Sequence, residues 1–425
     1  MSDELRPRST RSKKLSTIAR HGRQRRSNPF VTVAKVLAAA LAVLLVSGAS
    51  VAAIATFDIA ASVKDGVQLA NEPEGGAKVE IDAIPGGVNL LVVGSDSRKG
   101  QDAAFGPEDS TGDLNDVTML LHISEDHTNA SVISFPRDMY VPIPECPDPA
   151  GGTLSAMRSQ KINTTLTNGG LACTVLTVEK LTGLSIPYAA EVQFSGVMAM
   201  SSAVGGVPVC VAEDIEDEYT GTFLKAGMHT LEGLEALQFL RTRHGVGDGS
   251  DLTRISNQQV FLSSLVRTVK SASTLSDPIK VYSLAKAVTA NMNLSTSLND
   301  VSTLASIAVA MKDIDLSKVV FAQVPTGFVE GGVIPAQPDF DDLFTAVAAD
   351  DSLQLAPSPA VEDPAAEDPA AEDPAATTDP AAPADPAAPV PDPAATPPTA
   401  VLSDSVKGQT AGDVTCSAGR SLEDQ

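Results

Sequence analysis

Short apolar runs recur in the middle of the chain, with the length and composition expected of strands in a buried sheet. Three of them are rich in Val, Leu and Ile and contain no Asp, Glu, Lys or Arg: Val88–Val93, Val117–Ile123 and Ala130–Phe135. Continuous apolar runs of this kind are typical of strands covered on both faces, whereas strands with one face in water alternate apolar and polar residues.

Three further stretches have the apolar spacing of helices: Leu171–Leu181, Leu231–Leu240 and Leu252–Val269. Gly183 is a suitable C′ residue for the first helix. Thr230 and Asp251 are suitable N-caps for the second and third. Strands that alternate with helices predict an α/β domain, which we place at residues 86–350.

The beginning of the chain combines a basic segment with an uncharged run. Residues 1–30 contain nine Lys and Arg against two acidic residues, and the 22 residues of Val36–Phe57 carry no charge. About 20 apolar residues cross the hydrocarbon core as a helix. We predict a single transmembrane helix over 31–57, with residues 1–30 in the cytoplasm and the rest outside the cell membrane. A cleaved signal peptide is the alternative, although its apolar region is usually only about 7–15 residues long.

Two segments flank the predicted domain. Residues 58–85 contain breakers such as Pro73 and Gly75 and predict a polar extracytoplasmic stalk. From residue 351 the chain turns to Pro, Ala and Asp, and the unit EDPAA occurs three times from Glu362. Such a sequence cannot bury a core, so 351–425 is predicted to be a disordered anionic tail.

All four cysteines follow the apolar run, and an even number in an oxidising compartment favours disulfides. We favour the pair Cys146–Cys173, because a staple would stabilise the loop-like sequence between them. Cys416 could tie the end of the chain back to the domain. Four cysteines allow three pairings, and buried free thiols are the other interpretation. No CxxC or Cys/His cluster favours a zinc site.

The net charge and the aromatic content argue against certain classes of binding partner. The chain has 53 acidic against 30 basic residues, a formal net charge of -23, no Trp and four Tyr. An acidic chain repels a phosphate backbone, so DNA and RNA are not expected as partners. The low aromatic content also argues against an aromatic-rich surface for stacking bases or sugars.

Within this acidic chain, a group of polar residues lies at the ends of apolar stretches. Asp96 and Arg98 follow the first predicted strand, Asp116 opens the second and Arg137 follows the third. Open α/β sheets bind ligands at such strand ends. The full group is Asp96, Arg98, Asp116, Arg137, Lys161, Arg241, Arg243, Arg254 and Gln258.

These residue types suit a metal and a phosphate. Arginine holds phosphate oxygens with two parallel hydrogen bonds. Arg254 and Gln258 share a helix face near an N-terminus, which favours anions. Asp96 and Asp116 could share Mg²⁺, which takes one or two carboxylates and leaves other positions to phosphate and water. Any one of these residues would normally be a turn residue or a solvated charge, but together they predict phosphoryl chemistry. No G-x-S-x-G or Walker A motif suggests another reaction.

The stretches that carry these residues closely resemble the LytR-CpsA-Psr family of bacterial cell-wall enzymes. They cover about 88–265 in the family's order and include VNLLVVGSDSR, NDVTMLLHIS, SVISFPRDMYV, KINTTLTNGG and LRTRHGVGDGSDLTRISNQQ. The resemblance implies a mixed central sheet flanked by helices. It also implies transfer of a polyprenyl-pyrophosphate-linked glycopolymer to peptidoglycan through a phosphodiester, with release of polyprenyl phosphate.

The resemblance assigns roles within the group. Asp96 and Asp116 would hold Mg²⁺, or Mn²⁺ in its place, and the arginines would clamp the pyrophosphate with help from Lys161 and Gln258. Asp138, or an Asp outside the metal shell, would act as the base. The apolar faces of Leu171–Leu181 and Leu252–Val269 could line a pocket for the lipid, although ordinary core is the better interpretation for any single residue there. One departure is Asn257, where many members carry another Arg, so the clamp is expected to be slightly weaker.

Two other functions fit the same residues. One is a non-catalytic wall protein that binds polyprenyl-pyrophosphate glycans and regulates their synthesis, although a binder has no need of two metal-binding carboxylates. The other is a pyrophosphatase that uses water as the acceptor and releases the lipid carrier. The polymer itself, whether arabinogalactan, teichoic or capsular, is not indicated by the sequence.

Overall fold

The computed structural model describes residues 29–62, 64–72, 84, 86–99, 101, 113–356 and 398–425. The chain divides into two compact units, Met1–Thr56 and Phe57–Gln425. The predicted basic segment, part of the predicted stalk and the EDPAA repeats fall largely outside the described residues. The predictions for them stay predictions.

The first unit contributes most of helix α1, which spans Pro29–Ser62 and so includes the predicted span 31–57. Among the residues that the structure describes, no helix meets both the length and the apolarity needed to cross a membrane. The membrane anchor stays a prediction.

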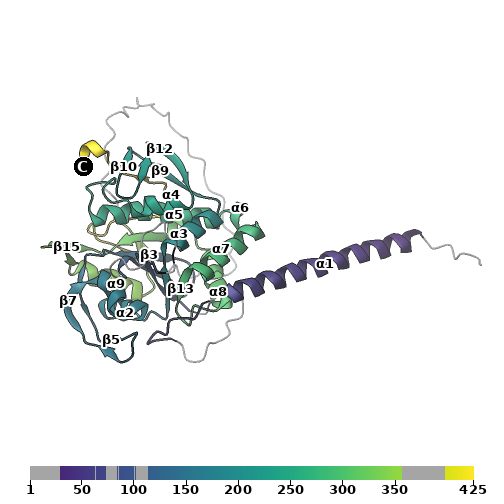
Figure 1. The fold of residues 1–425 in the computed structure, drawn as a ribbon, viewed down its shortest axis with the longest axis horizontal. Coiled ribbons are helices and arrows are strands. Elements are labelled where there is room, and N and C mark those ends of the chain that lie inside the picture. The colour runs from purple at the N-terminus through teal and green to yellow at the C-terminus, as the bar shows by residue number, and fades with distance from the viewer. Residues whose placement is uncertain are drawn as a thin grey trace, which may run out of the picture. The chain divides into compact units, whose positions relative to one another are not determined.

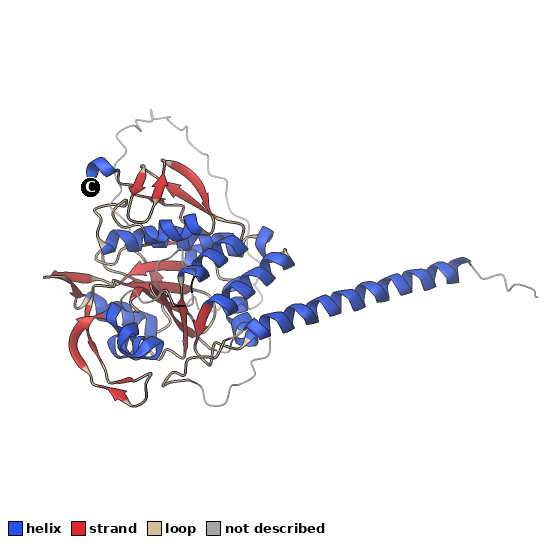
Figure 2. Ribbon diagram, viewed as in Figure 1, coloured by secondary structure: helices blue, strands red, loops and turns tan. Residues whose placement is uncertain are grey.

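The second unit is built on a seven-stranded mixed sheet of order β13-β8-β1-β2-β3-β14-β19 (Figures 1 and 2). Its strands are β1 (Val88–Ser95), β2 (Asn115–Ile123), β3 (Ala130–Phe135), β8 (Tyr188–Val192), β13 (Met292–Leu294), β14 (Val319–Gln323) and β19 (Gly408–Thr410). The pairs β1–β8 and β3–β14 are parallel and the others are antiparallel. The three predicted strands and the mixed sheet are confirmed.

Helices cover both faces of this sheet. Successive residues of a strand point to opposite sides, so the strands contribute side chains to two separate cores. Leu91 and Val93 pack in a core with α2 and α9, whereas Val88 belongs to a second core with α8. The helices are α2 (Thr165–Thr182), α3 (Phe194–Ala203), α4 (Leu234–Arg241), α5 (Asp251–Lys270), α6 (Ala272–Leu275), α7 (Pro278–Asn291), α8 (Val301–Lys312) and α9 (Asp339–Ala348). Figure 1 shows α3, α4 and α5 on one side of the sheet and α2 and α9 on the other.

Short strands form ribbons around these layers. The pairs are β4 (Tyr140–Ile143) with β7 (Met157–Lys161), β5 (Cys146–Pro147) with β6 (Thr153–Leu154), β10 (Ile215–Asp217) with β11 (Thr222–Leu224), β15 (Thr326–Val329) with β16 (Gly332–Pro335), and β17 (Ser352–Gln354) with β18 (Thr399–Val401). A three-stranded sheet joins β12 (Gly227–Leu231), β9 (Val207–Val211) and β20 (Cys416–Ser417).

Two of the predicted helix starts are wrong. Thr230 is not an N-cap, because it lies in β12 and pairs with Pro208, and α4 begins only at Leu234. At α5 the N-cap is Ser250, whose hydroxyl accepts from the Thr253 amide. The predicted end of α2 is confirmed, since Gly183 takes the left-handed conformation at φ 76°.

The predicted disordered tail is wrong for the last 28 residues. Residues 398–425 are ordered, and Gly408–Thr410 forms the edge strand of the central sheet against β14. This segment is too short to fold alone, but it buries Leu402, Val406 and Ala411 against the domain. Likewise the described part of the predicted stalk packs on the domain, where Leu69 is 3% exposed.

Both disulfides close loops within the second unit. Cys146–Cys173 is the predicted pair and is confirmed, and Cys210–Cys416 ties the C-terminal segment to β9. The alternative of buried free thiols is excluded.

Candidate active site

One edge of the central sheet gathers residues that lie far apart in the sequence. Because β1 runs parallel to β8 and antiparallel to β2, the ends of β1 and β8 meet the beginning of β2. The end of β3 lies at the same edge, where Phe135 pairs with Thr118. Asp96 directly follows β1, Asp116 is the second residue of β2 and Arg137 comes two residues after the end of β3, so all three lie at this edge, as the sequence predicted.

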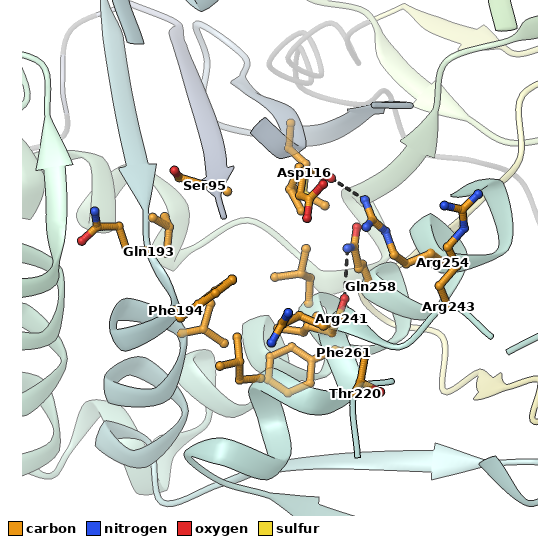
Figure 3. Close-up of a pocket in the computed structure, with 18 of the residues that line it drawn as sticks. Ser95, Asp116, Gln193, Phe194, Thr220, Arg241, Arg243, Arg254, Gln258 and Phe261 are labelled. Atoms are coloured by element: carbon orange, nitrogen blue, oxygen red, sulfur yellow. Dashed lines mark hydrogen bonds between the residues drawn. The ribbon is translucent and has the colours of Figure 1, made fainter. Parts of the chain in front are cut away.

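A cavity of about 410 Å³ opens beside this edge, between the sheet and helices α3, α4 and α5 (Figure 3). One part of its lining is charged and the other is apolar. The predicted residues on the lining are Asp116, Arg137, Arg241, Arg243, Arg254 and Gln258. Asp96, Arg98 and Lys161 are not on it.

Arg137 is held by three carboxylates. Its Nη1 lies 2.6 Å from Asp116 Oδ1, and its Nε lies 3.6 Å from Asp138 and 3.7 Å from Asp251. Its backbone amide also donates to Asp251 Oδ2 at 3.1 Å. Burial alone would lower the pKa of Arg137, but the charges of these carboxylates outweigh it and raise the pKa. Arg137 therefore stays fully charged, and its direction is fixed before a ligand arrives.

Arg254 is the most deeply placed cation of the site, with 5% of its surface exposed. Its Nη2 lies 3.0 Å from Asp251 Oδ1 and donates to the backbone oxygen of Asp116 (Figure 3). Burial lowers its pKa, while Asp251 and Asp116 oppose that shift. One turn further along α5, Gln258 donates from Nε2 to the Leu240 oxygen at 3.2 Å. Both predicted neighbours on this helix face are confirmed as cavity residues.

The segment after α4 supplies Arg241 and Arg243. Arg241 lies over the ring of Phe194, 4.5 Å from its centroid, at the junction of the charged and apolar walls. Its side chain reaches the cavity, but the surrounding protein removes hydration and lowers its pKa. Arg243 donates from Nε to the Gly249 oxygen at 3.0 Å. Among the residues that the structure describes, neither arginine forms an ion pair, so both can accept an anionic partner.

The remaining predicted residues lie around the cavity. Asp96 accepts from the Leu114 amide at 2.8 Å. Burial raises its pKa, the Leu114 hydrogen bond lowers it, and the charge of Asp116 raises it further. Arg98 is half-buried. It lies near Arg241, since its positive charge contributes to lowering the pKa of Arg241. Lys161 is paired with Asp138 at 2.7 Å.

Asp138 was one of two predicted candidates for a base, and its surroundings favour another role. Burial would raise its pKa, but the hydrogen bond from Lys161 and the charge of Arg137 outweigh it and lower the pKa. A carboxylate with a depressed pKa is a weak base. Asp138 therefore orients Arg137 and Lys161.

Sequence reasoning missed two carboxylates. Asp251 looked like a helix cap and instead binds Arg137 and Arg254. Asp217 gave no signal, yet it is 0% exposed and accepts from the Thr242 hydroxyl and the Arg243 amide. It follows Glu216 in an acidic stretch, so no local pattern in the sequence distinguishes it from its exposed neighbours.

The apolar wall is only partly as predicted. Phe261, Leu262 and Leu265 of α5 line the cavity, as expected for 252–269. The stretch Leu171–Leu181 does not, because α2 covers the opposite face of the sheet. Its place is taken by α3 and α4 together with the sheet: Val92, Val117, Met119, Val192, Phe194, Val197, Met200, Leu237 and Leu240.

Residues 416–420 of the C-terminal segment contact α5 and the loop before it, outside the cavity lining. Asn257 of α5 donates to the Phe239 oxygen at 2.8 Å and accepts from the Ser417 hydroxyl. The Gly247 amide donates to the Ala418 oxygen at 3.1 Å, and the Arg420 amide to the Gly245 oxygen at 2.9 Å. The loop between Arg243 and α5 is thus pinned by residues 416–420.

The chain is similar to known proteins in sequence and fold. The sequence profile of the LytR_cpsA_psr family matches residues 55–342. The cell wall biosynthesis protein LcpA of Corynebacterium glutamicum is 30% identical over 315 residues, which is 68% of this chain and 58% of LcpA. The chain therefore spans little more than half the length of that relative.

Two further known proteins are similar to the chain over about two thirds of its length. The polyisoprenyl-teichoic acid–peptidoglycan teichoic acid transferase TagT of Bacillus subtilis is 27% identical over 305 residues, 70% of this chain and 88% of TagT. The solved LytR-Csp2A-Psr enzyme of Actinomyces oris superposes with a TM-score of 0.50 at 21% identity, covering 67% of this chain and 96% of that one, and shares the fold. The matched profile covers more than half of the sequence, and the chain belongs to the LytR_cpsA_psr family.

Proposed function

We propose that the protein transfers a glycopolymer from a polyprenyl-pyrophosphate carrier to peptidoglycan, forming a phosphodiester and releasing polyprenyl phosphate. The observation that carries the proposal is a cavity with a cationic part and an apolar part. Asp116, Arg137, Arg241, Arg243 and Arg254 make up the charged part. The name of TagT, a teichoic acid transferase, supports the transfer of a polymer to peptidoglycan, and the name of LcpA supports a role in cell wall biosynthesis.

The two parts of the cavity match the two ends of such a carrier. The pyrophosphate is a compact anion, and arginines hold its oxygens in a fixed geometry. The polyprenyl chain is apolar, and burying it between Met200, Leu240 and Leu265 removes it from water. Phe194, which lies against Arg241, marks the boundary between the two.

The reaction breaks the phosphoanhydride bond of the pyrophosphate and forms a phosphodiester. A hydroxyl oxygen of peptidoglycan attacks the phosphorus that carries the glycan, its proton passes to a base, and the bond to the polyprenyl phosphate breaks with its electron pair on the leaving oxygen. The protein mainly positions the reactants and neutralises charge that develops on the phosphate oxygens. Arg137 suits this task because its carboxylate partners hold it in place before the ligand binds.

The carboxylates also suit Mg²⁺, with Mn²⁺ as a substitute. Asp96 and Asp116 flank neighbouring strand ends, and Asp116 acts on the pKa of Asp96, so the two charges lie close together. Among the described residues, no group of three or more His, Cys, Asp and Glu side chains could hold a metal. Mg²⁺ needs only one or two carboxylates when phosphate oxygens complete its shell, so the pair is sufficient. When bound, the ion would neutralise charge on the leaving phosphate.

We also propose that the N-terminal segment anchors the protein. The uncharged run Val36–Phe57 follows a basic segment, which is typical of a single span with a cytoplasmic N-terminus. This arrangement would place the cavity outside the cell membrane, where peptidoglycan and the carrier meet.

The test uses the full-length protein in detergent with a polyprenyl-pyrophosphate oligosaccharide, a peptidoglycan fragment and Mg²⁺, with products followed by mass spectrometry. Arg137→Ala is the variant and Arg158→Ala, in β7 and outside the cavity, is the control. We expect a phosphodiester-linked product that falls about 100-fold or more in Arg137→Ala and persists in the control. Lipid monophosphate with an unattached glycan phosphate would indicate a pyrophosphatase. Binding without turnover would indicate a non-catalytic binder.

A further inference from the structure

Tyr219 is a large aromatic residue that lines the cavity and yet is 81% exposed. It lies in the turn between β10 and β11, and its ring centroid is 4.6 Å from that of His244. His244 directly follows Arg243 in the sequence, and both line the cavity. The two rings therefore form an accessible apolar surface at the mouth of the cavity, on the side of the arginines.

The fold holds this pair in place with a single buried carboxylate. Asp217 Oδ1 accepts from the amides of Tyr219 at 2.9 Å and Thr220 at 3.3 Å. Asp217 Oδ2 accepts from the amides of Arg243 at 3.1 Å and His244 at 3.2 Å. Because one side chain binds both segments, Tyr219 and His244 keep a fixed position relative to Arg243.

We propose that Tyr219 and His244 form a subsite for the first sugar rings of the glycan, next to the pyrophosphate. The inference rests on the proposed function and adds to it a place for the glycan. The lipid occupies the buried apolar wall and the pyrophosphate meets the arginines. The group on the other side of the pyrophosphate must then leave the cavity through its mouth, where Tyr219 lies.

The chemistry of the pair suits a sugar better than a lipid. A flat aromatic face packs against the C–H groups of a pyranose ring, while the tyrosine hydroxyl stays in water. Thr220, the next residue of the turn, also lines the cavity and offers a hydroxyl for hydrogen bonds (Figure 3). The low aromatic content of the chain argued against an aromatic-rich sugar surface, and this subsite needs only one pair of rings.

The test compares two ligands that differ only in the glycan. Binding to the full-length protein in detergent would be measured for polyprenyl pyrophosphate alone and for the same lipid carrying a disaccharide. Tyr219→Ala removes the ring, Tyr219→Phe keeps it, and Phe223→Ala removes an exposed aromatic of β11 that is outside the cavity lining. Melting temperatures check that all variants fold.

We expect Tyr219→Ala to weaken binding of the glycosylated lipid by about 2- to 13-fold, since an aromatic contact contributes about 0.5–1.5 kcal/mol. Binding of the bare lipid should not change, and Tyr219→Phe and Phe223→Ala should bind both ligands like the wild type. Equal weakening of both ligands, or no weakening of either, would overturn the subsite. If the wild-type protein bound neither lipid, the proposed function itself would be wrong.

Discussion

Replacing Asp217 with Asn tests whether one carboxylate organises this part of the site. The change keeps the shape of the side chain and removes its charge. Asp217 accepts five hydrogen bonds: from the amides of Tyr219, Thr220, Arg243 and His244 and from the hydroxyl of Thr242. An amide has only one oxygen, so its NH₂ group must face either the two donors on one side or the three on the other.

The favourable orientation leaves at least two donors without an acceptor. A donor left unpaired in a buried place costs about 1–3 kcal/mol, and the two are not fully additive, so we expect a loss of about 2–4 kcal/mol. Unfolding entropy scales with chain length, at about 2.1 cal/mol/K per residue. For a unit that spans 57–425, the melting temperature should then fall by about 3–5 °C.

Acid provides a second measurement with a definite sign. Burial would raise the pKa of Asp217, but the Thr242 hydroxyl and the surrounding amides outweigh it and lower the pKa below the ordinary value of 3.8. The stabilisation is therefore fully present above pH 3.8 and is lost as the pH falls through the lower folded-state pKa. The wild type should melt above the Asn variant at neutral pH, and this gap should shrink below pH 3.8.

The control is Asp214→Asn, three residues earlier. Asp214 accepts from Lys225 at 2.7 Å and from the Ala226 amide at 2.8 Å on the exposed side of the same ribbon. Its replacement should change the melting temperature little, because exposed ion pairs contribute little. Equal melting temperatures for the two variants, or a gap to the wild type that does not depend on acid, would refute the role assigned to Asp217.

Two other predictions concern the disulfides and the metal. Cys210–Cys416 closes a loop of 206 residues and Cys146–Cys173 one of 27, so replacing the first pair with Ser should cost about 5 kcal/mol against about 3.5 for the second. Calorimetry of the two double variants checks this, and a larger loss for the shorter loop would contradict it. Chelation with EDTA should abolish transfer and Mg²⁺ should restore it, whereas Asp96→Asn should need more Mg²⁺ for half-maximal rate. A rate that is indifferent to EDTA would remove the metal from the proposal.

Much of the site was predictable because strand ends are visible in the sequence. Asp96, Asp116 and Arg137 each adjoin an apolar run, and they meet because β1 and β3 end at the edge of the sheet where β2 begins. Helical spacing predicted that Arg254 and Gln258 share one helix face, and the family resemblance assigned that face to the phosphate. These local signals were enough to predict these charged residues of the site.

Contacts between distant segments were not visible in the same way. Asp251 reaches Arg137 across 114 positions, and at the start of a helix it resembles a cap. The edge strand Gly408–Thr410 carries no apolar run, since its place in the sheet depends on pairing with β14. Composition alone therefore assigned the whole C-terminal segment to a disordered tail.

Asn257 shows how such a distant contact changes the meaning of a residue. In the sequence it looked like a lost arginine of the phosphate clamp. In the fold its side chain, 2% exposed, ties α5 to the Phe239 oxygen of α4 and to Ser417. Residues of α5 that face the cavity are spaced by three or four positions, as Arg254, Gln258 and Phe261 are, and position 257 lies to one side of that stripe. An arginine there would be buried among the groups that Asn257 now joins. The expected weakening of the proposed clamp stays a prediction, and Asn257 has a structural contact of its own in the fold. Through these two hydrogen bonds Asn257 joins α5, which carries Arg254, to α4, which ends at Arg241, and to the C-terminal segment.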